Sequence, residues 1–261
     1  MTAPHEINPL FFNRYRDNRG KSDLAPFFNN QEALWNKLEP TGSNPLKKHG
    51  VNVLTMRLLL AQDALGKMKD YEMAIKRKPG QYVMPPEMQT AASGVSNRVL
   101  YPDPSTGNAG EVISTETIRL HEYFYSFVSS LVSALDWLAN EINAAYSLGI
   151  KRVDWGELER RCELLHDKNP TLEALIRSVA DDPRKIRLFD CRNVSEHEGL
   201  VRIEEVPDLS SVVIDENYVI TVADDPRNPS SPVHTPLIRD AKSLFSFVVE
   251  SCCDAVYATM L

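Results

Sequence analysis

Apolar side chains recur at helical spacing along much of the chain, and the longest such stretch predicts one dominant helix between Thr115 and Gly149. Intervals of three, four and seven residues place its apolar positions on one face. Ser114 or Thr115 can cap the start of this helix, and Gly149 can end it. A helix of this length with a wide apolar face must pack in a bundle or across a dimer interface. The apolar positions are Ile118, Phe124, Leu131, Leu135, Leu138, Ile142 and Ala145.

Two further long helices are expected, one before and one after this segment. The first spans Val53 to Lys78, where three consecutive cations suit the C-terminal end of a helix. The last runs to Met260 and follows Thr235-Pro236, an N-cap and a first-turn proline. The expected buried stripes are Val53, Met56, Leu60, Ala64, Met68 and Tyr71 in the first helix, and Leu237, Leu244, Val248, Cys252 and Val256 in the last.

Shorter elements are expected between the long helices. Each of three short helices has a residue suited to one of its ends: 155–166 after Asp154, 172–179 after Thr171, and 184–198 before Gly199. Residues 200–223 then change to a period of two, which predicts a β-hairpin. Its turn is expected near Asp215-Glu216-Asn217.

The N-terminal part of the chain is less regular. Residues 1–50 show little periodicity, and residues 80–110 are rich in Pro, Gly, Ser and Asn, which predicts a long loop and a domain boundary. We therefore expect a mainly α fold with two parts. Residues 1–110 form an irregular extension with one long helix and a loop, packing on the rest, and 111–261 form a helical bundle with a small β-hairpin insertion.

Composition narrows the class of protein. The four cysteines lack both disulfide-scaffold and CxxC zinc spacing, so we expect reduced thiols and no metal or cofactor. Neither a secretory signal nor an apolar run long enough for a membrane span is evident, which predicts a cytoplasmic protein without a membrane partner. The net charge is −7, yet residues 1–80 carry 13 Lys and Arg against 8 Asp and Glu. A polyanion would be tolerated mainly by this segment or by a local pocket.

The segment from Arg192 to His197 carries the most distinctive chemistry. Asn193 and His197 are four residues apart and share a helix face, and Arg192 and Glu196 share a neighbouring one. Arg192 and His197 differ by about 140° around an α-helix. They can converge because arginine is long and because we expect the helix to unwind near Gly199. A guanidinium, an amide and an imidazole together suit phosphodiester cleavage, because histidine transfers a proton and arginine binds phosphate oxygens.

Two other segments also place a histidine a few residues after an arginine, but they differ from Arg192–His197 in residue type or in helix compatibility. Between Arg161 and His166 the chain has apolar residues where the segment from Arg192 to His197 has a polar one. The stretch from Arg227 to His234 contains two prolines and cannot be helical. Glu122, Asp136 and Glu141 on the long helix are weaker candidates, since charges on an amphipathic helix are usually solvated.

An arginine, a polar residue and a histidine placed late in a helical bundle resemble the motif of HEPN domains (higher eukaryotes and prokaryotes nucleotide-binding). The helix carrying Ser133-Ala134-Leu135-Asp136-Trp137-Leu138 is similar too, and the resemblance covers residues 111–261. It implies a HEPN-like homodimer acting as a metal-independent endoribonuclease in a toxin–antitoxin or phage-defence setting. Arg192 would bind the scissile phosphate, and Glu196 would also contact the substrate. His197 would be the general acid and base, and Asn193 would orient either Arg192 or His197.

Two alternatives remain open. The bundle is equally compatible with a non-catalytic binding or scaffold protein whose partner is a nucleotide, RNA or an antitoxin-like protein. In that case Arg192 pairs with Glu196 or Asp190, and His197 serves as a cation at a helix end. A third hypothesis places RNA contact in the basic N-terminal segment, at Arg14, Arg16, Arg19, Lys47, Lys48 and Lys76–Lys78.

Overall fold

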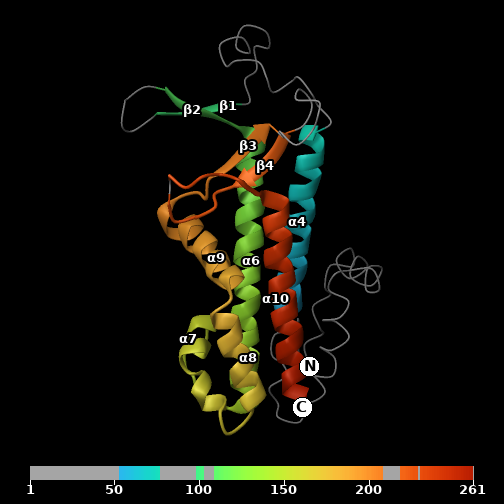
Figure 1. The fold of residues 1–261 in the computed structure, drawn as a ribbon, viewed down its shortest axis with the longest axis vertical. Coiled ribbons are helices and arrows are strands. Elements are labelled where there is room, and N and C mark those ends of the chain that lie inside the picture. The colour runs from blue at the N-terminus through green and yellow to red at the C-terminus, as the bar shows by residue number, and fades with distance from the viewer. Residues whose placement is uncertain (1–52, 77–97, 103–108, 208–217, 229, 261) are drawn as a thin grey trace, which may run out of the picture. The chain divides into compact units, whose positions relative to one another are not determined.

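The expected mainly α fold is confirmed. A computed structural model describes residues 53–76, 98–102, 109–207, 218–228 and 230–260 (Figure 1). In chain order the elements are α4 (Val53–Lys76), β1 (Arg98–Pro102), β2 (Ala109–Ser114), α6 (Thr115–Tyr146), α7 (Trp155–Arg160), the 3-10 turn η2 (Cys162–Leu165), α8 (Pro170–Ala180), α9 (Pro183–Asn193), the π-helical turn η3 (Val194–Glu198), β3 (Ile203–Pro207), β4 (Tyr218–Val222), β5 (Thr235–Pro236) and α10 (Leu237–Met260).

The described residues fall into two compact units. Those of unit 1 lie within Met1–Gln62, Val128–Phe189 and Lys242–Leu261, and those of unit 2 lie within Asp63–Phe127 and Asp190–Ala241. Helices α4, α6, α9 and α10 contribute residues to both units. The candidate residues Arg192 to His197 all belong to unit 2. Packing of residues 1–110 on the bundle stays a prediction, because residues 1–52 and 77–97 lie outside the described ranges.

Helix α6 starts at Thr115 as expected, but the prediction that Gly149 ends it is wrong. The last helical residue is Tyr146, and Ser147 adopts a positive φ of 48°. The backbone N–H of Leu148 then donates to the carbonyl of Asn143, at 3.1 Å. This six-to-one hydrogen bond, with a left-handed residue before its donor, is the Schellman arrangement that ends many helices. Gly149 has a positive φ of 73° but lies in the connection beyond the helix.

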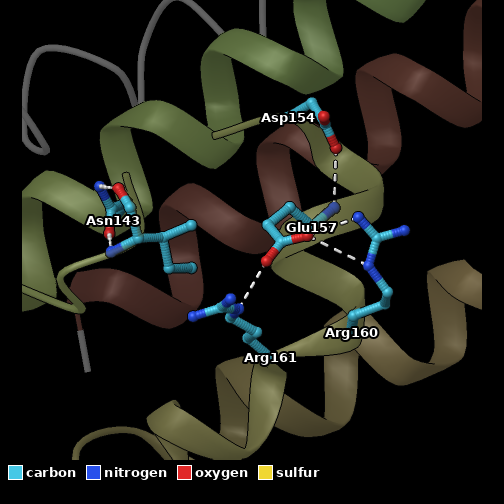
Figure 2. Close-up of polar contacts among 6 residues, drawn as sticks. Asn143, Asp154, Glu157, Arg160 and Arg161 are labelled. Carbon is cyan, nitrogen blue, oxygen red and sulfur yellow. Dashed lines mark hydrogen bonds and ion pairs between the residues drawn. The ribbon is translucent and has the colours of Figure 1, made fainter. Parts of the chain in front are cut away.

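The connection from α6 to α7 is held by side chains from both ends (Figure 2). Asn143 exchanges two hydrogen bonds with the backbone of Ile150, at 3.1 and 3.2 Å. Asp154 is the expected N-cap of α7, and its Oδ1 accepts from the backbone N–H of Glu157 at 2.7 Å. The carboxylate of Glu157 in turn binds Arg160 and Arg161. The single helix predicted over 155–166 is wrong, because α7 ends at Arg160 and a 3-10 turn follows.

Helix α8 begins earlier than its sequence suggests, and Thr171 is not its cap. Asn169 takes that role, and its Oδ1 accepts from the backbone N–H of Leu172 at 2.9 Å. Pro170 then occupies the first helical position, where a missing N–H costs nothing. The side-chain amide of Asn169 also donates to Tyr146 Oη and to the carbonyl of Ala258, both at 2.8 Å. One residue therefore joins the start of α8 to α6 and α10.

The buried faces of the long helices match prediction unevenly. The expected stripe of α10 is buried throughout, and in α6 only Ile118 and Ala145 are half-buried. In α4 the predicted stripe is confirmed only at Ala64 and Met68, since Val53, Met56 and Tyr71 are half-buried and Leu60 is 37% exposed. The buried apolar side chains of α4 are Leu54, Leu58, Ala61, Ala64, Leu65 and Met68. The three consecutive leucines at 58–60 project from different sides of the helix, so the sequence is compatible with more than one buried stripe.

Two small antiparallel sheets complete the fold. In the first, β1 pairs with β2, so the long loop predicted over 80–110 is wrong for residues 98–102 and 109–110. In the second, β3 pairs with β4 as the hairpin pattern predicts, and the expected turn at 215–217 lies outside the described residues. Strand β5 adds to β4, which means that Thr235-Pro236 forms a strand rather than the cap of α10.

All four cysteines are free thiols. Cys162, Cys191 and Cys252 are buried, and Cys253 is half-buried. Burial raises the pKa of Cys253 to about 11 and that of Cys252 well above its ordinary value, so both stay protonated near neutral pH. Among the helices that are described, none combines the length and apolar character that crossing a membrane requires.

Candidate functional site

Helix α9 and the turn η3 that follows it carry the candidate residues, and this segment is fixed at both ends. At its start, Asp182 Oδ1 accepts from the backbone N–H of Arg184 at 2.8 Å, which satisfies one free donor of the first turn. Cys191 is fully buried and Val194 is 6% exposed, so these two side chains anchor the far end of the segment in the core. Arg192 and Asn193, which lie between these anchors, are half-buried, and Glu196 and His197 beyond them are exposed residues.

The motif lies where α9 widens into the π-helical turn η3. The backbone N–H of Gly199 donates to the carbonyl of Val194, five residues earlier, at 2.9 Å. A turn closed over five residues rotates each residue by less than the 100° of an α-helix. Arg192 and His197 are therefore offset by less than the 140° of a regular α-helix. Isolated π-turns of this kind occur frequently at functional sites.

One carboxylate oxygen lies between the arginine and the histidine. Glu196 Oε2 is 2.8 Å from Arg192 Nε and 3.8 Å from His197 Nε2. The first distance is a charge-assisted contact, and the second becomes an ion pair when the imidazole is protonated. The two candidate groups thus approach the same point in space. Of the pairings considered for Arg192, the one with Glu196 is present, whereas Asp190 instead binds Arg227 at 2.6 Å.

Asn193 contacts the arginine rather than the histidine. Its Oδ1 accepts a hydrogen bond from Arg192 Nη1 at 3.3 Å. Asn193 and Glu196 therefore hold two different nitrogens of one guanidinium, which restricts the rotamers available to this long side chain. Within the described residues no hydrogen bond joins Asn193 to His197, although four positions separate them.

The three charged side chains differ in exposure. The side chain of His197 is 67% exposed, whereas those of Arg192 and Glu196 are 34% and 23% exposed. An exposed imidazole reaches solvent and can exchange protons with a bound molecule. The half-buried guanidinium is held more firmly, as a group that fixes the position of an anion should be.

The segment from Arg161 to His166 does not bring its arginine and histidine to one carboxylate. Arg161 binds Glu157 at 2.5 Å, whereas His166 Nδ1 binds Glu173 Oε2 at 2.9 Å. Arg177 binds the other oxygen of Glu173 at 2.7 Å. These contacts, that of Arg177 first and that of His166 second, hold the pKa of Glu173 below its usual value. A carboxylate between a histidine and an arginine therefore also occurs outside the motif, and His166 is a stringent control.

In the segment from Arg227 to His234, the arginine and the histidine also bind different carboxylates. Arg227 binds Asp190 on α9, and His234 Nδ1 binds Asp224 Oδ2 at 3.2 Å. Thr235 donates its hydroxyl proton to Asp224 Oδ1 at 2.6 Å. The hydrogen bonds from Thr235 and His234 keep the pKa of Asp224 below its ordinary range.

The weaker candidates on α6 have other surroundings. Asp136 Oδ1 accepts from the backbone N–H of Trp155 at 2.9 Å and so ties the α6–α7 connection. Glu122 is exposed. Glu141 is only 4% exposed, neither of its carboxylate oxygens has a hydrogen-bond partner, and burial raises its pKa to about 8. Within the described ranges, histidine, cysteine and carboxylate side chains do not gather in groups of three or more that would hold a metal ion.

Comparison of the chain with protein-family models, with curated protein sequences and with solved structures gives no significant match.

Proposed function

We propose that this protein is a HEPN-like, metal-independent endoribonuclease that acts as a homodimer in a toxin–antitoxin or phage-defence setting. The observation that carries the proposal is the π-helical turn, which directs Arg192 and His197 to one carboxylate oxygen. The high exposure of His197 and the contact between Arg192 and Asn193 support it further.

The chemistry is transphosphorylation of RNA. The ribose 2′ oxygen attacks the adjacent phosphorus as its proton passes to a neutral His197, and a bond from phosphorus to the 2′ oxygen forms. The bond from phosphorus to the 5′ oxygen breaks, and that oxygen takes a proton from the protonated imidazole of the partner's His197. Arg192 stabilises the negative charge on the phosphoryl oxygens in the transition state. The products are a 2′,3′-cyclic phosphate and a 5′-hydroxyl, with no metal or water consumed.

The test is cleavage of a mixed-sequence single-stranded RNA in EDTA. His197→Ala should lower the rate by about 10²- to 10⁴-fold, the usual contribution of a general acid or base. Arg192→Ala should lower it by about 10²-fold or more, as loss of a charge-stabilising donor does. His166→Ala and His234→Ala, which remove the histidines of the two similar segments, should cleave like the unaltered protein. Equal cleavage by His197→Ala and the unaltered protein contradicts the proposal.

A second function, RNA or protein binding without catalysis, is favoured by one observation. Arg192 is already paired with Glu196, and an arginine whose charge is compensated can serve structure as well as catalysis. Under this alternative the protein binds RNA in EDTA but leaves it intact, and His197→Ala binds as tightly. The basic segment of the third hypothesis lies outside the residues whose side chains are described.

A further inference from the structure

The position of Glu196 within the candidate site has a consequence for substrate binding. Its Oε2 lies 2.8 Å from Arg192 Nε and 3.8 Å from His197 Nε2, where the proposed reaction requires a phosphate oxygen. A carboxylate and a phosphate present similar anionic oxygens to a guanidinium, and both are bound by it through charge-assisted hydrogen bonds. The carboxylate and an incoming phosphate therefore compete for the same donors.

We propose that the Glu196 carboxylate occupies the phosphate position in the free protein and that RNA must displace it to bind. This inference rests on the proposed function. It assigns Glu196 a role in regulating access to the site, in place of direct contact with the substrate.

The pair is built so that displacement is feasible. Arg192 and Glu196 are four residues apart on consecutive turns, and both side chains remain partly exposed. Ion pairs of this kind are weak because water and salt compete for both partners. Glutamate has three rotatable side-chain bonds, so its carboxylate can turn away while the backbone of η3 stays in place. Arg192 would meanwhile keep its hydrogen bond to Asn193 Oδ1.

The charge of Glu196 also selects among substrates. While the carboxylate is present, Arg192 is compensated and an approaching phosphate meets a negative charge. A single phosphate then gains little binding free energy at this site. A polynucleotide also binds through several other phosphates, and these contacts can offset the free energy needed to displace Glu196. Removing the charge of Glu196 should therefore strengthen binding.

The experiment measures the affinity of a fluorescently labelled 2′-O-methyl RNA, which cannot undergo transphosphorylation, by anisotropy in EDTA at fixed salt. Glu196→Gln keeps the size of the side chain and removes its charge, so it should lower Kd by about fivefold or more. Glu196→Ala should shift Kd in the same direction. Glu173→Gln, which also removes a carboxylate placed between a histidine and an arginine, should change Kd by less than about twofold. Circular dichroism establishes that each variant is folded at the temperature used.

The outcomes separate this inference from the proposed function. Equal or weaker binding by both Glu196 variants overturns the inference, and so does the same gain in Glu173→Gln. The proposed function depends on another readout, the cleavage of ordinary RNA by the unaltered protein and by His197→Ala. Tighter binding without cleavage would support the inference and reject the nuclease, and cleavage with weaker binding by Glu196→Gln would do the reverse.

Discussion

The backbone N–H of Gly199 donates to the carbonyl of Val194 at 2.9 Å, and this hydrogen bond closes the π-helical turn that carries Glu196 and His197. An α-helical continuation would direct the histidine further from Arg192. The turn ends at Gly199, whose φ of 138° and ψ of −134° are open only to residues without a β-carbon. The geometry of the candidate site therefore depends on a glycine outside the motif.

The first prediction concerns this glycine. Gly199→Ala should lower the free energy of unfolding by about 1–3 kcal/mol, because alanine is strained at this φ and ψ. Overlap with more distant parts of the fold is not the cause, since an added β-carbon would meet no atom within 4 Å beyond the neighbouring residues. Urea denaturation measures the effect. Gly66→Ala is the matched control, because Gly66 lies inside α4 with equal space, and it should raise stability by roughly 0.5–1 kcal/mol. Equal effects of the two substitutions would contradict the conformational explanation.

The second prediction concerns the cap of α8. Asn169→Ala removes the N-cap and the hydrogen bonds to Tyr146 and Ala258, so it should cost roughly 2–3 kcal/mol of unfolding free energy. Thr171→Ala, at the position that the sequence favours, should change stability by less than about 0.5 kcal/mol, because Thr171 is exposed and inside the helix. Thermal and urea unfolding of both variants measure the difference. A larger loss with Thr171→Ala would restore the sequence-based assignment.

The third prediction concerns the buried carboxyl of Glu141. Its pKa of about 8 in the folded protein lies above the ordinary 4.5, so the folded protein retains a proton that the unfolded chain releases. The stability that this proton contributes is complete below about pH 4.5 and is lost as the pH rises toward 8. Glu141→Gln removes this dependence, so its stability relative to the unaltered protein should rise by roughly 3 kcal/mol between pH 5 and 8.

Urea unfolding at pH 5, 6.5 and 8 measures this difference. Comparing the two proteins at each pH cancels the contributions of all other titrating groups, among them Glu173, Asp182 and Asp224, whose lowered pKa values affect stability mainly below about pH 4.5. The stabilisation that these three carboxylates contribute to the folded protein is lost as the pH falls, and the three residues are unchanged in the variant. Glu122→Gln, on the exposed side of the same helix, should show no such pH trend. A constant difference between Glu141→Gln and the unaltered protein would mean that Glu141 is solvated.

The sequence predicts helices and their buried faces correctly where the apolar pattern fits only one helix face. The presence of α6 and α10, though not their predicted end at Gly149 and cap at Thr235, follows from three- and four-residue spacing, as does the stripe of α10. Asp154 is the evident cap before Trp155. Prediction from the sequence failed in α4, where leucines at 58–60 offer several faces, and at α8, where Asn169 and Thr171 are both good caps. Glu141 lies three positions after Leu138 and seven after Ala134, so its place on the buried face was predictable from spacing alone.

In the candidate site the residue types were predictable from the sequence, whereas the local geometry was not. The residue types and the position of Gly199 mark the segment from Arg192 to His197 as distinctive. A change of winding near Gly199 is expected from the sequence, but its form as a π-turn was not predictable, because such a turn depends on which carbonyl the N–H of Gly199 selects and not on any residue pattern. The partners of His166 and His234 were equally inaccessible, since Glu173 and Asp224 are brought to them by the packing of α8 and by the β4–β5 connection.

Under the proposed function, Arg192 and His197 act together in metal-independent transphosphorylation. The most direct measurement is the chemical nature of the ends that form when the protein cuts RNA in EDTA, with His197→Ala run beside it. The proposed reaction yields 2′,3′-cyclic phosphate and 5′-hydroxyl ends from the unaltered protein and little product from the variant. Ends bearing a 5′-phosphate, or the same products in equal yield from His197→Ala, would contradict it.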